Sequence, residues 1–141
     1  MSIRLIIDDK KNTKKILIKN KITFGRNKEV VDIVLDDPKV SSKHFEIIYD
    51  KSSILVRDLS SKNGTFINQK RIENEEPLYV YDILKAGSIS ISIDAKSLTS
   101  SEFERLYRKT DPNYWGENIT NILKTSKFVL KDIKKPIKIK R

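Results

Sequence analysis

The sequence contains no cysteine and only one histidine among its 141 residues. The absence of cysteine excludes disulfides, thiolate zinc sites and cysteine nucleophiles, and a single histidine excludes a multi-histidine metal site. No stretch approaches the roughly 20 apolar residues of a membrane-spanning helix, and the first residues lack the apolar core of a signal peptide. We therefore expect a cytoplasmic protein that has no cofactor, no metal and no contact with a membrane.

Charged residues make up 34% of the chain and hydrophobic residues 38%, which is compatible with a soluble domain of modest core. The net charge of +10 is unevenly distributed. Residues 1–94 carry 17 Lys/Arg and 14 Asp/Glu, a net charge of +3, whereas residues 95–141 carry 12 and 5, a net charge of +7. We predict a domain at residues 1–94 and a basic extension at residues 95–141 that is partly helical, with roughly the last ten residues disordered.

Up to Asp94, hydrophobic and polar residues alternate with the period of two that is typical of half-buried strands. The runs at residues 3–7 and 16–18 flank a polar turn and predict a hairpin, and residues 88–93 alternate strictly between Ser and Ile. Further strands are predicted near residues 22–24, 33–35, 45–49, 54–56, 65–67, 78–80 and 83–84. Short strands separated by frequent turn signals predict an all-β sandwich or barrel.

Beyond Asp94 the pattern becomes helical. Thr99–Glu102 and Ser101–Glu104 both have the spacing of a capping box, which marks the start of a helix. The residues that would share one face of this helix are Phe103, Leu106 and Tyr107. Residues 119–123 predict a second short helix, so we expect helices to pack on the sandwich before the lysine-rich end.

Three polar segments stand where predicted strands begin or end: Gly25–Arg26, Val40–His44 and Leu59–Asn68. With the later segment Asp82–Gly87, their order and separation closely resemble the forkhead-associated (FHA) domain family over about residues 3–94. The resemblance implies an eleven-stranded β-sandwich of the SMAD/FHA type. It also implies that loops at one end of the sandwich bind phosphothreonine peptides without covalent chemistry.

The resemblance assigns roles to individual residues. Arg26 supplies a planar, permanently charged fork for the phosphate, hydroxyl groups add further donors, and Asn63 holds the peptide backbone. The complete set of predicted peptide-binding residues is Arg26, Ser41, Ser42, Lys43, Lys62, Asn63 and Asn68. The residues predicted to support the binding loops are Gly25, His44, Gly64 and Thr65. Ser42 occupies a position that is commonly basic in the family, so we expect the affinity to depend heavily on Arg26.

The same residues also have plainer interpretations. Gly25–Arg26 can be a turn with a solvated charge, the two serines can cap a turn, and Asn63–Gly64 is a strong hairpin signal by itself. Asn68 can brace a loop instead of contacting a ligand. The acidic pairs at residues 36–37 and 75–76 are expected to be solvated surface in turns.

Three functions therefore stay open at the level of sequence. The favoured one is an adaptor that binds phosphothreonine proteins downstream of a Ser/Thr kinase. The others are nucleic-acid binding through the basic residues 95–141, and a phosphate-independent interaction or assembly role. An enzyme is not expected, because no nucleophile–base pair, metal cluster or nucleotide-binding loop is visible. The oligomeric state is not indicated.

Overall fold

The computed structural model describes residues 3–50 and 53–108. The chain divides into two compact units, Met1–Tyr107 and Arg108–Arg141. The first unit contains all the described residues except Arg108. The second helix predicted at residues 119–123 and the predicted disordered end lie outside the described residues.

Eleven short strands, one 3-10 helix (η1) and one α-helix make up the described part of the chain. The elements are β1 (Arg4–Asp8), β2 (Thr13–Leu17), β3 (Lys21–Gly25), β4 (Ile33–Val34), β5 (Phe45–Asp50), β6 (Ser53–Asp58), β7 (Phe66–Ile67), β8 (Lys70–Arg71), β9 (Glu75–Pro77), β10 (Leu84–Ala86), β11 (Ile89–Ile93), η1 (Ala95–Ser97) and α1 (Ser100–Leu106). None of the described helices has the length and apolar character needed to cross a membrane.

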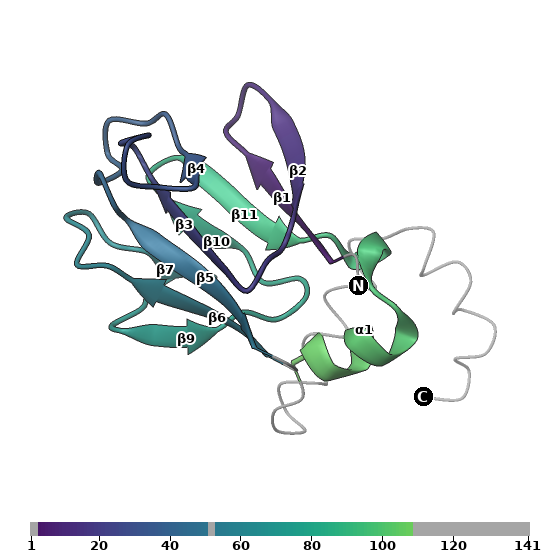
Figure 1. Ribbon diagram of the computed structural model, residues 1–141. Helices are drawn as coiled ribbons and strands as arrows, with labels where there is room; N and C mark the ends of the chain where they lie inside the picture. Colours follow the sequence, from purple (N-terminus) through teal and green to yellow (C-terminus); the bar gives the residue numbers. More distant parts are fainter. Residues whose placement is uncertain (1–2, 51–52, 109–141) are drawn as a thin grey trace, which may run out of the picture. The chain divides into compact units, whose positions relative to one another are not determined.

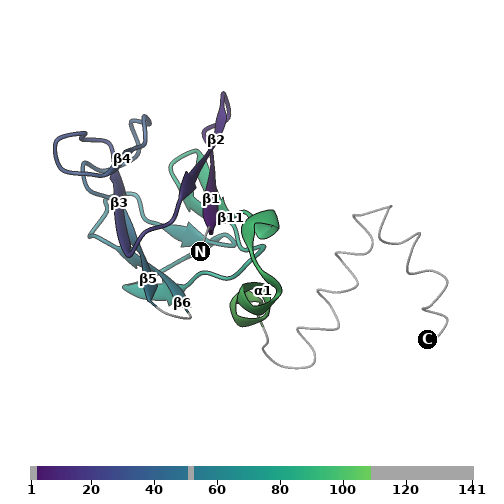
Figure 2. The ribbon, with the colours of Figure 1, turned by 45° about the vertical axis from the view of Figure 1, so that its right-hand side comes forward.

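The strands form two sheets that face each other as a sandwich (Figures 1 and 2). One sheet has the strand order β2-β1-β11-β10-β7-β8, and the other has the order β4-β3-β5-β6-β9. Every pair is antiparallel except β3 and β4, which run parallel. The predicted N-terminal hairpin is β1–β2, with Leu5 opposite Ile16. The prediction of an all-β sandwich is thus confirmed.

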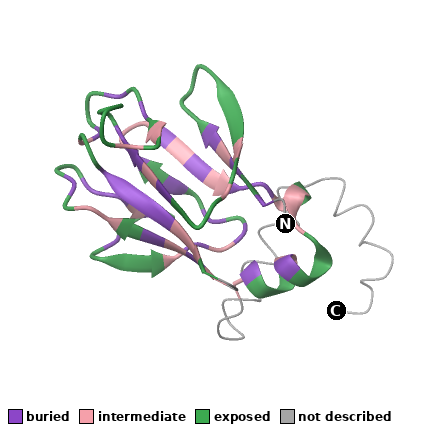
Figure 3. Cartoon of the chain, viewed as in Figure 1, coloured by how far each residue is buried: buried purple, intermediate pink, exposed green. Residues whose placement is uncertain are grey.

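The core lies between the sheets and takes alternate residues from strands such as β1, β6 and β11 (Figure 3). In β11, the three isoleucines are buried while the serines between them are half exposed. Phe24 of β3 and Phe45 of β5 are both fully buried, and their rings stack with centroids 4.6 Å apart. Strands with this period must bury one face, so the alternation seen in the sequence determines which side chains enter the core.

The residues after β11 pack onto the same core. Helix α1 begins with the predicted capping box: the Thr99 hydroxyl accepts the Glu102 N–H, and the Glu102 carboxylate accepts the Thr99 N–H. Leu106 is 1% exposed and belongs to the core cluster, and its carbonyl accepts the Val80 N–H at 2.7 Å. The predicted first helix is therefore present and packed, while the division into domains after Asp94 stays a prediction.

One strand lies a few residues from its predicted position. The structure has β9 at Glu75–Pro77, and not a strand at residues 78–80. Leu78 is buried as the alternation requires, and its N–H still bonds to Ile54 O at 2.8 Å. The ladder between β6 and β9 ends at Leu55 opposite Pro77, and hydrophobic alternation alone could not show that. The short strand β8, made of two exposed charged residues, has no hydrophobic signal at all.

The loops that follow β3, precede β5 and follow β6 gather at one end of the sandwich, on the left of Figure 1. Helix α1 lies at the other end, on the right of both ribbon views (Figures 1 and 2). The two ends can therefore serve different purposes.

Candidate functional site

The three loops at this end of the sandwich are residues 26–32, 35–44 and 59–65, and hydrogen bonds connect them to one another. The backbone N–H of Arg26 donates to Ser41 O at 2.9 Å, and the N–H of Asn27 donates to Ser42 O at 3.3 Å. These bonds bring Arg26 beside Ser41, although the two predicted phosphate-binding residues are 15 positions apart in the sequence.

Gly25 makes this close approach possible. A Cβ at this position would lie 2.1 Å from Ser42 O and 2.9 Å from a methyl carbon of Val31. The first of these atoms belongs to the backbone of the neighbouring loop, so a side chain at position 25 would push that loop away. The glycine is required by packing against the backbone, and it places Arg26 at the edge of the site.

His44 connects the second loop to the third. The residue is 0% exposed. Its Nδ1 accepts the Ser41 N–H at 3.0 Å, which places the proton of the neutral ring on Nε2, and Nε2 donates to Gly64 O at 2.9 Å. Each ring nitrogen thus satisfies one backbone group of a different loop. Both ring nitrogens are thus bonded to loop backbone, which fits the prediction that His44 supports the loops.

Asp58, at the end of β6, organises the third loop. Its carboxylate accepts the hydroxyl and the N–H of Ser61, and the hydroxyl of Thr65 at 2.6 Å. Burial raises the pKa of Asp58, but the hydrogen bonds from Ser61 and Thr65 outweigh burial and hold the pKa below its ordinary value. Gly64 completes the loop with a φ of +94°, a left-handed conformation that favours glycine.

Two polar side chains of the site keep unused hydrogen-bonding capacity toward solvent. The Ser41 hydroxyl oxygen accepts the Lys62 N–H at 3.0 Å, and since its hydrogen has no acceptor among the described residues, it can donate to an anion. The amide nitrogen of Asn63 donates to Lys39 O at 2.8 Å. The amide oxygen of Asn63 has no hydrogen-bond donor among the described residues, which leaves it free to accept a peptide N–H.

Arg26 is exposed, and its guanidinium is held only loosely by a contact of 3.5 Å from Nη1 to Pro38 O. Within residues 3–50 and 53–108, Arg26 forms no ion pair. The remaining predicted residues of these loops, Ser42, Lys43 and Lys62, are also exposed. The end of the sandwich therefore presents the Arg26 guanidinium, for which the described residues form no ion pair, with further cations and neutral donors around it.

Asn68 belongs to a different part of the structure. It lies in the turn between β7 and β8, where Asn68 and Gln69 both have positive φ, the conformation of a two-residue hairpin turn. Its amide nitrogen donates to the Asp82 carboxylate at 2.9 Å, and its amide oxygen accepts the Ile83 N–H at 3.0 Å. These contacts of Asn68 are those of a residue that braces one turn against another, and a contact with peptide stays a prediction.

Asp37 corrects an expectation from the sequence. It was expected to be solvated, but it is 7% exposed, and its carboxylate accepts the N–H of Lys39 and both the N–H and the hydroxyl of Ser88. The Ser88 hydroxyl is the strongest of these influences, and together they lower the pKa of Asp37. Asp37 thus ties the second loop to the β10–β11 turn of the opposite sheet. Glu75, also expected in a turn, lies in β9 and pairs with Arg57 at 3.0 Å.

The sequence could have indicated one of these supports. Asp58 stands three residues before Ser61, which is the spacing of a carboxylate that folds back onto a following turn. The Asp37–Ser88 contact spans 51 residues and has no local signal.

Among the described residues, no group of three His, Asp or Glu side chains is arranged to hold a metal ion. The geometry fits binding of an anionic group on a peptide.

Comparison with known proteins agrees with this geometry. The model of the FHA domain family matches residues 22–87, which include all three loops. A domain solved in a structural and functional analysis of phosphothreonine-dependent FHA domain interactions is 30% identical, with a TM-score of 0.57, over 66% of this chain and 95% of that one. The chain belongs to the FHA domain family. FHA domains are interaction modules, so protein interaction is the general role of residues 22–87.

Two further proteins, one bacterial and one human, are similar to this chain. The FHA domain of the CT664 protein from Chlamydia trachomatis is 25% identical, with a TM-score of 0.62, over 66% of this chain and 96% of that domain. The nuclear inhibitor of protein phosphatase 1 from Homo sapiens is 33% identical over 76 residues, which cover 52% of this chain. The match spans only 19% of that human protein, so the similarity concerns a small part of its length.

Proposed function

We propose that this FHA domain binds phosphothreonine-containing segments of partner proteins, as a non-enzymatic adaptor downstream of a Ser/Thr kinase. The observation that carries the proposal is the convergence of Arg26, Ser41 and Asn63 from three separate loops onto one end of a rigid sandwich. The phosphothreonine-dependent interactions of a relative that is 30% identical support the same chemistry.

Each group has a distinct role in this proposal. The Arg26 guanidinium bonds the phosphate oxygens with a planar pair of N–H donors, which suits a dianion better than a single ammonium does. The Ser41 hydroxyl donates its free hydrogen to another phosphate oxygen. The free amide oxygen of Asn63 accepts a backbone N–H of the peptide beside the phosphothreonine.

The lysines of the loops make a smaller contribution. Lys43 and Lys62 are exposed, and no ion pair of either is found in the described part of the chain. They add a screened, long-range attraction for the anionic peptide. Ser42 contributes a hydroxyl where a cation is common in the family, so Arg26 carries most of the fixed charge at the phosphate. The predicted cytoplasmic location stays a prediction, and the human relative is named as a nuclear protein.

The proposal is tested by screening a phosphothreonine peptide library and then titrating the selected peptide into the protein in a calorimeter. Substituting phosphoserine for phosphothreonine removes a methyl group and is expected to cost about 0.8 kcal/mol or more. Removing the phosphate is expected to abolish binding. The Arg26→Ala variant is expected to bind about ten- to a hundredfold more weakly, because a charge-assisted hydrogen bond contributes about 1.5–3 kcal/mol.

Arg4→Ala is the matched control, because Arg4 is also exposed but lies in β1, outside the three loops. The Arg4→Ala variant should bind the selected peptide as the unaltered protein does. Both variants should keep their thermal stability, since an exposed arginine contributes little to it. Equal affinity of the Arg26→Ala and Arg4→Ala variants, or a library screen that selects no peptide, contradicts the proposal.

A further inference from the structure

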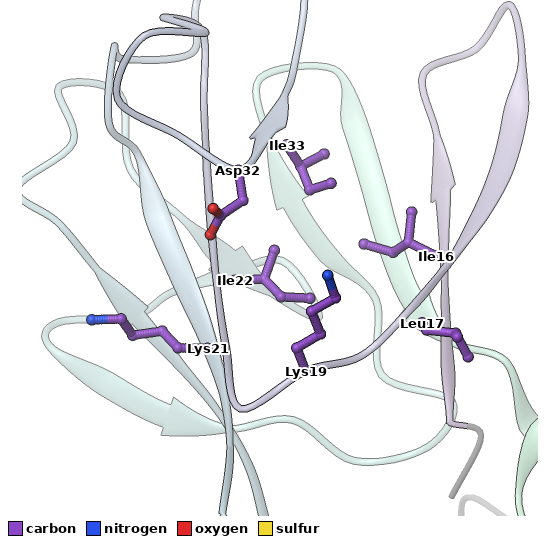
Figure 4. Close-up of a pocket in the computed structure, with 7 residues that line it drawn as sticks. All are labelled: Ile16, Leu17, Lys19, Lys21, Ile22, Asp32 and Ile33. Atoms are coloured by element: carbon purple, nitrogen blue, oxygen red, sulfur yellow. The ribbon is translucent and has the colours of Figure 1, made fainter.

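A groove opens between the edges of the two sheets, and of the three loops only the last residue of the first, Asp32, lines it. It has a volume of about 510 Å³ and is lined by Ile16, Leu17, Lys19, Lys21, Ile22, Asp32 and Ile33. Figure 4 shows Ile16 and Leu17 on the β2 side and Ile22, Asp32 and Ile33 on the opposite side, with Lys19 from the connecting segment. We refer to it as the β2–β4 groove, because edge strand β2 and edge strand β4 border it.

The floor of the β2–β4 groove is apolar and continuous with the core. Ile22 is buried, and Ile16 and Ile33 are partly buried and pack against the core cluster. Leu17 is 53% exposed, and Val34, next to Ile33 in β4, is 43% exposed. Large exposed aliphatic side chains beside an open groove leave an apolar surface without a covering element in the described structure.

Strand β2 also has an unpaired backbone edge. It pairs only with β1, and the Ile18 N–H donates to Ile3 O, which sets the alternation of the ladder. In an antiparallel pair, every second residue exchanges hydrogen bonds with the partner strand, and the residues between point their N–H and C=O groups away from it. By this alternation Thr13, Lys15 and Leu17 direct their backbone groups outward, where no other described strand pairs with them.

The charge around this edge is mainly positive. Four lysines lie along this edge: Lys14 and Lys15 in β2, Lys19 in the connecting segment and Lys21 at the start of β3. Lys15 and Lys21 are partly neutralised by Asp94 and Glu46, at 3.3 and 3.8 Å, whereas no ion pair of Lys14 or Lys19 is found in the described part. The one acid of the groove, Asp32, uses a carboxylate oxygen to accept the Thr23 N–H. The edge therefore attracts acidic residues.

Lysines on an edge strand also prevent pairing with an identical edge, because like charges would meet. The same repulsion disfavours two possible occupants of the groove. One is strand β2 of a second copy of the protein, and the other is the basic residues 95–141 of the same chain, which carry a net charge of +7. An acidic strand does not meet this repulsion. An extended strand is also the occupant that can use the outward N–H and C=O groups of β2 and the apolar floor at once.

We propose that the β2–β4 groove binds an extended, acidic, unphosphorylated segment of a partner protein, which adds to sheet edge β2 as a further strand. The ligand backbone bonds the outward groups of Thr13, Lys15 and Leu17. Alternate apolar side chains of the ligand cover Ile16, Ile22 and Ile33, and its acidic side chains meet Lys14 and Lys19. This site is separate from the phosphothreonine site and does not depend on it.

The test uses the full-length protein and the peptide acetyl-Asp-Val-Glu-Ile-Asp-Val-Glu-amide, with amide hydrogen exchange followed by NMR. At about ten times its dissociation constant, the peptide should slow exchange of the Lys15 and Leu17 amides about tenfold, because only the small free fraction then exchanges. A peptide with lysine in place of every acidic residue should have no effect. The Arg26→Ala variant should respond as the unaltered protein does.

Leu17→Pro removes an outward N–H that the β1–β2 ladder does not use, so the fold should persist while peptide protection disappears. Leu17→Ala is the matched control, because it shortens the same side chain but keeps the N–H, and it should retain protection. Four results overturn the proposal. Two concern the peptide: it does not protect the Lys15 and Leu17 amides, or it changes exchange only in the loops around Arg26. The other two occur without peptide: these amides are protected at every protein concentration, or their protection rises with protein concentration. The last two would identify a segment of the same chain and a second copy.

Discussion

At the scale of single residues, one buried side chain connects two of the loops of the candidate site. His44 is fully buried and satisfies the Ser41 N–H and the Gly64 carbonyl, which lie in different loops. Without the imidazole, both backbone groups lose their partners inside the protein, and a buried group without a partner costs about 1–3 kcal/mol.

We therefore expect His44→Ala to lower the free energy of unfolding by roughly 2–5 kcal/mol, as measured by urea denaturation. The phosphopeptide affinity should fall with it, because the loops that carry Ser41 and Asn63 lose their common anchor. Lys43→Ala is the control: Lys43 is the exposed neighbour, and its removal should change stability by about 0.5 kcal/mol or less. Equal effects of the two substitutions would mean that His44 does not hold the loops.

At the scale of elements, the start of α1 shows how tertiary context selects between two local signals. Thr99–Glu102 and Ser101–Glu104 have the same capping-box spacing, but the structure uses the first pair. With this start, Leu106 at the end of α1 reaches the core, where it is 1% exposed, and its carbonyl bonds to Val80. The structure thus places the N-cap of α1 at Thr99 and the last residue of the helix, Leu106, in the core.

This choice predicts different outcomes for two similar substitutions. Thr99→Ala removes the oxygen that accepts the Glu102 N–H, and it should lower the free energy of unfolding by about 1 kcal/mol. Ser101→Ala removes only an exposed contact with Arg105 at 3.3 Å, and should have an effect within about 0.5 kcal/mol. Thermal or urea unfolding of both variants measures the difference in the free energy of unfolding. A larger loss of stability for Ser101→Ala than for Thr99→Ala would contradict the assignment of Thr99 as the residue that caps the helix.

At the scale of the whole molecule, two carboxylates couple the binding loops to the sandwich and make its stability sensitive to acid. Asp37 joins the second loop to the opposite sheet through Ser88, and Asp58 holds the third loop through Ser61 and Thr65. The pKa of each carboxyl is lowered from its ordinary value of 3.8, by the Ser88 hydroxyl for Asp37 and by hydrogen bonds that outweigh burial for Asp58.

A carboxyl whose pKa is lower in the folded state binds protons more readily when the chain is unfolded, so its contribution to stability is complete above the unfolded value. That contribution is lost as the pH falls through the folded value. We expect the free energy of unfolding to decrease as the pH falls below about 4, and Asp37→Asn and Asp58→Asn each to make this decrease shallower. Urea denaturation across this range measures it. Asp36→Asn, which removes an exposed neighbouring carboxylate, controls for the change in net charge. If stability decreases equally with falling pH in all variants, Asp37 and Asp58 are not the source of the acid sensitivity.

The sequence by itself determined the sandwich, since strands of period two must bury one face, and four short motifs in order identified the family. It also indicated Arg26, Ser41 and Asn63 as site residues and Thr99–Glu102 as one start of the helix. These are local signals, which propensity and spacing express within a few residues.

Only the tertiary structure decided which distant groups meet. The bounds of β9, the burial of Asp37 against Ser88, the commitment of the Asn68 side chain to residues 82–83, and the open edge of β2 all depend on partners far along the chain. A residue's own neighbours do not specify such partners, because sheet pairing and loop packing are chosen by the free energy of the whole fold.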